Sequence, residues 1–416
     1  MRGTIYGVKP GLVAVLAGFA VAGLAGDLAR GAAGLGDSVG WANLRGPDHN
    51  GISVEKDWFT PGAKARIAWR TSVGDGYSSV AVVGGRIYTM GYVGKDDVVY
   101  CLDARQGTNV IWRHAYPCSG GQYPGPRATP TLDGDAVYTF SRDGDLLCLA
   151  AEDGKVRWSR ALAKELKVAP PGWGFASSAL VLQNTVFVNA GAHGVAINKQ
   201  SGVTLWESGV GIAGYATPVP FTVAGKPALL VFAGKSMEVV DAATGKELQR
   251  HPWETGYDVN AADPLVVGPD RFFISTGYQR GCAMLQIAED KLTVKWENKN
   301  MSTHFSSCVL WNGYIYGFDG NVGKGDLKCL DAETGEVKWS DSSLGFGGLM
   351  LADGKLVVLT ERGDLAVVAA TPQGFQQLFR ENVMKGTCWT APVVAGGRVY
   401  CRNDKGELVC VDLTGK

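Results

Sequence analysis

The sequence predicts an all-β protein, an eight-bladed β-propeller built from four-stranded antiparallel blades. Three observations lead to this fold class. A turn phrase recurs at a regular interval, short runs rich in Val and aromatic residues fill each interval, and the two ends of the repeat region complete one another. Glycine is abundant, with 58 residues among 416, as expected of a chain with many tight turns.

The turn phrase sets the period of the repeat. LDAETGEVKW at 330–339 has counterparts at 102–112, 149–158 and 240–248, and its glycine falls at 107, 154, 202, 245, 335, 374 and 415. The intervals are 47, 48, 43, 90, 39 and 41 residues, and a degenerate copy at 287–296 divides the interval of 90. Eight units with a period of this length and β character are typical of propeller blades.

Each unit reads as strands joined by tight turns. In the last unit, APVVA, GRVYC and ELVCVDL are separated by Gly396–Gly397 and by Asp-Lys-Gly. Two-residue hairpins need residues that accept positive φ, which Gly and Asn do readily. The same turn is predicted at Gly84–Gly85, Asp133–Gly134, Gln183–Asn184, Asn312–Gly313 and Asp353–Gly354.

The turn phrase itself has a structural explanation. Asp331 ends a third strand and can accept hydrogen bonds from the amides of the turn, while Gly335 supplies a left-handed backbone position. Trp339 lies on the fourth strand, where its ring can fill the gap between neighbouring blades. The corresponding structural residues are Asp103, Gly107, Trp112, Gly154, Trp158, Gly202, Trp206, Asp241, Gly245 and Trp296.

The ends of the repeat region predict how the ring closes. The last unit stops at VCVDLTGK without a fourth strand, and ARIAWRTSVG at 65–74 is a fourth strand with no blade before it. We therefore expect the N-terminal strand to complete the last blade. Closure removes the free strand edges that would otherwise promote aggregation.

The N-terminus indicates export. Arg2 and Lys9 precede a run of 16 apolar or small residues, GLVAVLAGFAVAGLAG, which is short for a transmembrane helix and typical of a signal peptide. We predict a signal peptide at 1–26, with an end as late as about 36, a leader at 37–64 and the propeller at 65–416. A retained N-terminal anchor stays open as the alternative, and export places the protein in the periplasm or cell envelope.

With the repeat laid out, the chain resembles the pyrroloquinoline-quinone-like (PQQ-like) β-propeller repeat family. The family signature YALDAxTGxxxW is similar to YCLDARQG at 100–107, KCLDAETGEVKW at 328–339 and VCVDLTG at 409–415. The stretch WANLRGPDHNGIS at 41–53 resembles the leader of exported propellers. The resemblance implies the propeller fold and leaves the function open, because the family holds quinoprotein dehydrogenases, the assembly scaffold BamB and members of no assigned activity.

The resemblance implies a choice between branches. The dehydrogenases carry adjacent cysteines, acidic calcium ligands and a catalytic Asp, and none of these could be placed on this sequence. We therefore expect a BamB-like, non-catalytic scaffold that binds a protein or peptide in the envelope, with no catalytic, cofactor or metal residues. A dehydrogenase using the quinone and calcium, and a carbohydrate-binding propeller, are the alternatives.

Cysteine and histidine give no metal pattern. Cys101, Cys148, Cys329 and Cys410 occupy equivalent positions of different units, so they are expected to be buried and far apart. Cys401 and Cys410 lie on adjacent strands of one unit, and a disulfide between them stays open as a possibility. The five histidines show no ligand spacing.

A binding site is expected at the mouth of the central channel, where first strands begin. The candidates are aromatic or polar residues at corresponding places in successive units: Tyr77, Arg127, Trp173, Tyr215, Asn260, His304, Phe346 and Trp389. The loop at 114–126 could also recognise a partner. Equal numbers of acidic and basic residues, 40 each, argue against nucleic acid, and we expect a monomer.

Overall fold

The computed structural model describes residues 40–288 and 291–415. All the described residues belong to one compact unit. The predicted signal peptide at 1–26 and residues 37–39 of the predicted leader lie outside the described residues. Among the described residues, no helix is long and apolar enough to cross a membrane.

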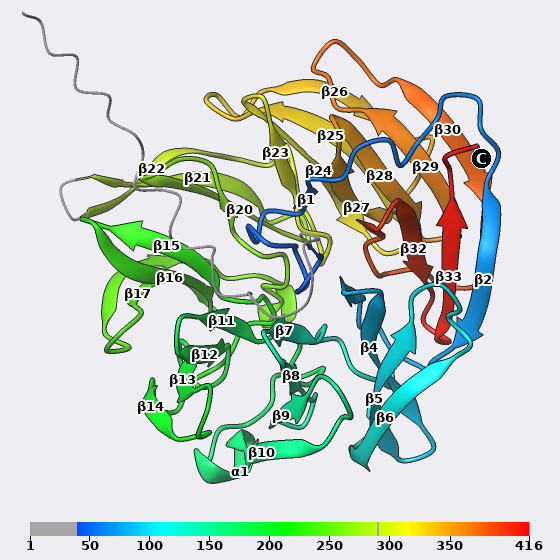
Figure 1. Ribbon diagram of the computed structural model, residues 1–416. Helices are drawn as coiled ribbons and strands as arrows, with labels where there is room; N and C mark the ends of the chain where they lie inside the picture. The colour runs from blue at the N-terminus through cyan, green and yellow to red at the C-terminus, as the bar shows by residue number, and fades with distance from the viewer. Residues whose placement is uncertain (1–39, 289–290, 416) are drawn as a thin grey trace, which may run out of the picture. The chain divides into compact units, whose positions relative to one another are not determined.

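The described chain folds as an eight-bladed β-propeller, which confirms the predicted fold class (Figure 1). Seven of the eight blades are four-stranded antiparallel sheets. The remaining one, blade 7, has a fifth strand, β1 (Ile52–Ser53), which pairs in parallel with its inner strand. Blades are numbered here in chain order from the one that begins at Ala81.

The strands of each blade run in order from the hub outward. Blades 1 to 4 comprise β3 (Ala81–Val83), β4 (Arg86–Val93), β5 (Asp96–Asp103) and β6 (Val110–Pro117); β7 (Thr131–Asp133), β8 (Ala136–Phe140), β9 (Asp145–Ala150) and β10 (Val156–Ala161); β11 (Leu180–Leu182), β12 (Thr185–Val188), β13 (Val195–Asn198) and β14 (Thr204–Glu207); and β15 (Val219–Val223), β16 (Lys226–Phe232), β17 (Ser236–Asp241) and β18 (Glu247–Pro252). Blades 5 to 8 comprise β19 (Leu265–Val266), β20 (Arg271–Thr276), β21 (Gly281–Ala288) and β22 (Lys291–Asn298); β23 (Val309–Trp311), β24 (Tyr314–Asn321), β25 (Lys324–Asp331) and β26 (Val337–Asp341); β27 (Gly347–Ala352), β28 (Lys355–Thr360), β29 (Asp364–Ala369) and β30 (Gln377–Asn382); and β31 (Val393–Ala395), β32 (Arg398–Arg402), β33 (Glu407–Asp412) and β2 (Arg66–Ser72). The described helices are α1 (Leu162–Glu165) and the 3₁₀ turn η1 (Gly256–Asp258).

The chain ends meet as the sequence predicts. β2 pairs antiparallel with β33, from Arg66 opposite Asp412 to Ser72 opposite Glu407, and so supplies the missing outer strand of blade 8. In Figure 1 the blue strand β2 lies beside the red strand β33. The ring is therefore closed by pairing of the two ends of the repeat region.

The tight turns between first and second strands follow the prediction with one shift. Ala395 pairs with Arg398, which leaves Gly396 and Gly397 as a two-residue loop with φ of 59° and 70°. In blade 2 the loop is one residue later than predicted, at 134–135, because Asp133 pairs with Ala136. Blade 4, for which no turn is named above, uses Ala224 and Gly225 with φ of 48° and 76°.

Adjacent blades are joined by the Trp and Gly of the turn phrase. The indole Nε1 of Trp158 donates to the Lys199 carbonyl of the next blade at 3.0 Å, and its ring lies against Gly202. The same indole-to-carbonyl bond, 2.7–3.2 Å long, is made by Trp69, Trp112, Trp206, Trp296 and Trp339. Blade 4 has Gln249 in the Trp position, and its side-chain oxygen accepts from the Leu292 amide.

The described part of the leader closes one end of the hub. Trp41 bridges to Val82 of blade 1, the Ala42 carbonyl accepts from Leu132 of blade 2, and β1 pairs with blade 7. These contacts all fall at the ends of inner strands next to the tight turns. The leader therefore forms a floor across the central channel.

Candidate functional site

The hub contains a cavity of about 330 Å³, which we call the hub cup. Its floor is the leader, through Trp41, Leu44, Arg45 and Gly51, and its wall is made by the residues just before and within the inner strands. Arg45 fixes the floor, since its guanidinium donates to the carbonyls of Cys308 at 2.6 Å and Asn50 at 2.9 Å. The cup therefore opens at the end where the inner strands begin.

The mouth of the cup carries an almost continuous band of aromatic rings, which we call the aromatic rim. Trp389 stacks on Tyr77 with centroids 5.5 Å apart and planes 20° apart. From Trp389, successive ring contacts of 4.7–6.2 Å lead through Phe305, His304, Tyr278, Tyr257 and Trp173 to Tyr215, and Tyr123 also contacts Trp389. Most of these rings come from loops between consecutive blades, so the rim follows from the repeated architecture.

Arg127 provides the cation of the rim. Its guanidinium lies 5.4 Å from the centre of the Tyr77 ring and donates to the carbonyls of Gly125 and Tyr123, both at 3.1 Å. Burial lowers the pKa of Arg127 to about 10. The side chain stays charged at neutral pH and gives the mouth a positive centre among apolar faces.

A relay of hydrogen bonds holds the wall together. The backbone N–H of one wall residue donates to a side-chain oxygen of the equivalent residue in the next blade, at 2.8–3.0 Å. The donors and acceptors in order are Ser79, Thr129, Ser178, Thr217, Asp263 and Ser307. Sequence reasoning missed this relay, although polar residues at intervals near one blade length were a usable signal.

Asp263 is the carboxylate of the cup lining. It is 7% exposed, accepts a hydrogen bond from the Thr217 amide at 2.8 Å, and has its pKa raised to about 6 by burial, an effect that the charge of Arg45 opposes. The carboxylate is thus part of the wall and remains largely ionised at neutral pH.

Six of the eight predicted mouth residues line the hub cup: Tyr77, Arg127, Trp173, Tyr215, His304 and Trp389. Asn260 and Phe346 do not. Asn260 is fully buried and ties loops together by donating to the carbonyls of Ala233 and Gly234, while Phe346 packs edge-on against Phe305. That the lining residues bind a ligand remains a prediction.

Two deep polar groups of the cup lack a hydrogen-bond partner among the described residues. Trp41 and Ser306 are among the residues that line the cavity, but the indole nitrogen of the first and the hydroxyl of the second are themselves buried, in residues that are only 4% and 6% exposed. Nδ1 of His304, on the wall, is also unpaired, and burial lowers the pKa of this imidazole to about 4. The cup thus has neutral polar residues below the aromatic rim.

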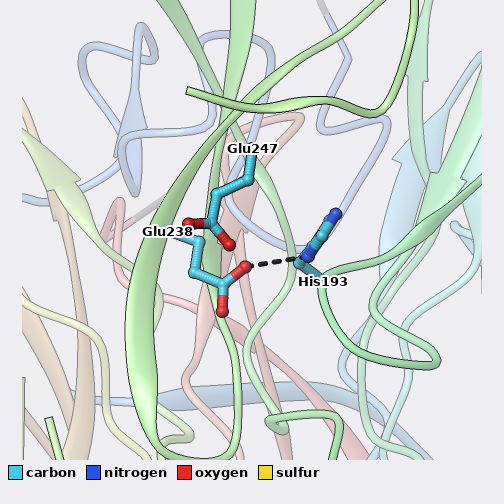
Figure 2. Close-up of side chains that lie close together, drawn as sticks. All are labelled: His193, Glu238 and Glu247. Atoms are coloured by element: carbon cyan, nitrogen blue, oxygen red, sulfur yellow. Dashed lines mark ion pairs between the residues drawn. The ribbon is translucent and has the colours of Figure 1, made fainter. Parts of the chain in front are cut away.

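A second cluster of functional side chains lies between blades 3 and 4. His193 in the turn between β12 and β13 faces Glu238 of β17 and Glu247 of β18, and one potential ligand atom from each lies within 4.8 Å of the others (Figure 2). No metal residue is predicted from the sequence, and this cluster is not among the predicted site residues. A signal was present, because Glu238 puts a charge in a third strand where Val195 and Ala283 stand in neighbouring blades.

All nine cysteines are free and buried. Cys410 lies opposite Tyr400 and Cys401 lies opposite Val409, so the two cysteine side chains point to opposite faces of the sheet. The disulfide that the sequence left open is therefore not formed. Cys101, Cys148 and Cys329 are likewise paired with Tyr88, Tyr138 and Tyr316 inside their blades.

Comparison with known proteins identifies the family. The sequence profile described as outer membrane protein assembly factor BamB matches residues 95–341 and 323–416. The chain belongs to the BamB family. It is 26% identical to BamB of Burkholderia pseudomallei over 345 residues, covering 79% of this chain and 81% of the relative. It is 24% identical to BamB of Salmonella typhimurium over 352 residues, covering 77% and 84%.

Solved structures share the fold of this BamB-family chain. The crystal structure of BamB from Moraxella catarrhalis has a TM-score of 0.60 at 17% identity, covering 84% of this chain and 98% of that one. Quinohemoprotein alcohol dehydrogenase from Comamonas testosteroni has a TM-score of 0.68 at 14% identity, covering 91% and 81%. The predicted resemblance to PQQ-like propellers is confirmed, and at these identities the two likenesses show the fold alone.

The lining of the cup does not fit calcium-assisted quinone chemistry. Calcium takes six to eight oxygen ligands, usually with several carboxylates, whereas Asp263 is the one acidic residue among those that line the cup. Its oxygen already accepts the Thr217 amide. This chain thus shares the propeller with the dehydrogenases, while its cup offers too few acidic ligands for calcium.

Proposed function

We propose that this protein is an exported, monomeric and non-catalytic scaffold that binds a protein partner during outer membrane protein assembly. Membership of the BamB family supports the process, since its curated relatives are named as outer membrane protein assembly factors. The proposal places the protein in the periplasm or cell envelope and involves no cofactor.

The aromatic rim is the surface on which we propose that the partner binds. Tyr257 is 75% exposed and Tyr123 is 44% exposed at the mouth, and Val210 and Ile212 of the loop between blades 3 and 4 are 78% and 49% exposed. Tyr and Trp are enriched in protein-binding sites because they bury large areas at low entropic cost. An exposed aromatic band on rigid blades is suited to a peptide segment of a partner.

Affinity capture from an envelope extract tests this proposal. The full chain is immobilised, and bound proteins are identified by mass spectrometry for the wild type and for Tyr257→Ala combined with Trp389→Ala. We expect the wild type to retain a protein of the outer membrane assembly machinery and the double variant to retain at least about tenfold less of it.

Leu378→Ala is the matched control. Leu378 is 41% exposed on the outer strand of blade 7, away from the rim, so this variant should retain the partner as the wild type does. Equal retention by the wild type and the rim variant would show that the partner binds elsewhere. Failure of the wild type to retain any assembly protein would contradict the proposed function.

Carbohydrate binding is a second candidate, supported by the unpaired Trp41 and Ser306 groups beneath the rim. Sugars present hydroxyls to such groups and apolar faces to aromatic rings. Affinity gel electrophoresis with envelope glycans measures this directly. Retardation by a glycan that Trp389→Ala abolishes would favour this function over the scaffold.

A further inference from the structure

The His193–Glu238–Glu247 cluster joins two blades through one buried and two partly exposed side chains. The side chains of His193, Glu238 and Glu247 are 13%, 1% and 33% exposed. His193 belongs to blade 3 and both glutamates to blade 4, so the cluster lies at the interface where Trp206 of blade 3 donates to the Ala242 carbonyl of blade 4. Figure 2 shows the imidazole and the two carboxyl groups turned toward one another.

The imidazole is oriented by a backbone carbonyl. Nε2 of His193 lies 3.1 Å from the Gly245 carbonyl oxygen, which can only accept a hydrogen bond, so Nε2 carries a hydrogen. Metal-binding histidines are typically held in this way, with one ring nitrogen donating to a carbonyl and the other free to ligate. The nitrogen left to ligate is Nδ1.

Nδ1 faces a carboxylate. It lies 3.0 Å from Oε2 of Glu238, an oxygen that is buried and has no hydrogen-bond partner of its own among the described residues. Two lone pairs cannot face each other at this distance in a buried place without repulsion. A cation, which can be a proton on Nδ1 or a metal ion, must therefore lie between these groups.

We propose that His193, Glu238 and Glu247 bind a divalent transition metal ion of the Zn²⁺ class, which ties blade 3 to blade 4. One imidazole and two carboxylates are a ligand set found in zinc sites, and a water or a partner's side chain would fill the fourth position. Metal binding requires the three ligand atoms to come closer together than they are here. The Glu247 side chain has room to move, because it lies on an outer strand and is partly exposed.

Arg250 competes with the metal in this proposal. Its Nη2 lies 3.1 Å from Oε1 of Glu238 and 2.6 Å from Oε2 of Glu247, and the side chain is 49% exposed. A metal ion would be repelled by this guanidinium, which can swing toward solvent. Removing Arg250 should therefore strengthen metal binding, whereas removing His193 should weaken it.

The experiment measures metal binding to the full chain after chelation and dialysis. Titration calorimetry with ZnCl₂ at about pH 7.5 should give one saturable equivalent, with release of any proton held on Nδ1 of His193. His193→Asn and Glu238→Gln should each weaken binding by at least about 100-fold, because one of three protein ligands is lost. Arg250→Gln should bind more tightly than the wild type.

His251→Asn is the matched control, because His251 lies on β18 beside the cluster and is not part of it. It should bind zinc as the wild type does. Lowering the pH should weaken wild-type binding by up to roughly tenfold per unit, since the metal displaces a proton from Nδ1. This dependence should disappear in His193→Asn.

Two results would overturn the proposal. They are the absence of a saturable equivalent in both the wild type and Arg250→Gln, or equal binding by the wild type and His193→Asn. Either result would assign the cluster to a proton-mediated ion pair alone. Arg250→Gln keeps all three ligands, so the test stands even if Glu238→Gln fails to fold, which circular dichroism would reveal.

Discussion

One buried residue, Arg402, holds the last blade against the first. Arg402 of β32 is 2% exposed, and its guanidinium donates to the carbonyls of Ser78 at 2.8 Å and Met90 at 2.5 Å and to the hydroxyl of Thr89 at 3.0 Å. Burial lowers its pKa to about 10. A buried cation is tolerated here because backbone oxygens of blade 1 surround it.

Replacing Arg402 should therefore weaken ring closure. Arg402→Met keeps similar bulk but leaves buried carbonyls without donors, so we expect a loss of about 3 kcal/mol in the free energy of unfolding. Urea denaturation measures it. Arg157→Met removes an exposed pair with Asp135 and should cost less than about 1 kcal/mol. Equal losses in the two variants would contradict the role given to Arg402.

The ion pair of His193 predicts a pH dependence of stability. Glu238 raises the pKa of His193 above its ordinary value of 6.5. The charged imidazole is therefore stabilising in the folded state, fully so below the unfolded pKa, and this contribution is lost as the pH rises through the folded pKa.

The comparison of wild type with His193→Asn isolates that contribution. With a chelator present to remove metal ions, the wild type should be more stable than His193→Asn. This difference in free energy of unfolding should be largest near pH 6 and should shrink toward pH 9. Urea denaturation at several pH values gives the difference. A gap that widens with pH would contradict the ion pair.

At the scale of residues, the sequence predicted which side chains lie near the mouth better than it predicted the contacts that they make. Tyr77 and Trp389 line the cup as expected, but Asn260 was selected for its position and polarity, and its amide is used up by loop carbonyls. Glu238 and His193 are 45 residues apart and meet only because consecutive blades are adjacent. Contacts of this kind depend on the exact twist between blades, which no spacing in the sequence reveals.

Elements are held together by the turn glycine and the Trp of the preceding blade. Gly245 has φ of 72°, and a Cβ added there would lie 2.5 Å from the Trp206 ring. The glycine is needed twice, for its backbone conformation and for the space above the indole. This contact repeats around the ring, which explains why the turn phrase is the strongest signal in the sequence.

Two glycines separate these effects. Gly245→Ala should cost about 3 kcal/mol, which combines the strain of a left-handed alanine with displacement of Trp206. Gly225→Ala has nearly the same φ, 76°, with nothing within 4 Å of the new Cβ, and should cost about 1 kcal/mol. Thermal or urea unfolding of both variants provides the measurement. Equal costs would show that the indole contact contributes little.

Strands and turns were largely predictable because hydrophobic alternation and Gly-rich turns are local signals. The exceptions are local too. Asp133 continues its strand, so the turn of blade 2 begins one residue later, and Ala224 adopts positive φ although it is neither Gly nor Asn. Pairing with the second strand decided both positions, against the preference of the single residue.

The whole molecule depends on closure of the ring by β2. A chain lacking residues 1–72 should expose the edge of β33 and lose the leader, and we expect it to aggregate. A chain lacking residues 1–39 retains every described strand and should remain monomeric. Size-exclusion chromatography with light scattering distinguishes them. A soluble monomer from the shorter chain would contradict the need for closure.

At this scale the sequence predicted the number of blades and the joining of the ends, since both follow from the repeat. It did not predict that the leader becomes the floor of the cup. The floor depends on Arg45 reaching the Cys308 carbonyl, 263 residues away, and on β1 adding to blade 7. Nothing in the leader sequence specifies which blades it contacts.

The central claim is that the aromatic rim binds a protein partner in the envelope. Site-specific photo-crosslinking in cells tests it most directly, with the photoreactive residue at Tyr257 on the rim or at Val203, which is 58% exposed beside the outer strand of blade 3. The account predicts a crosslinked outer membrane assembly protein from position 257 and none from position 203. Crosslinks to that protein from position 203 alone, or to no protein from position 257, would contradict it.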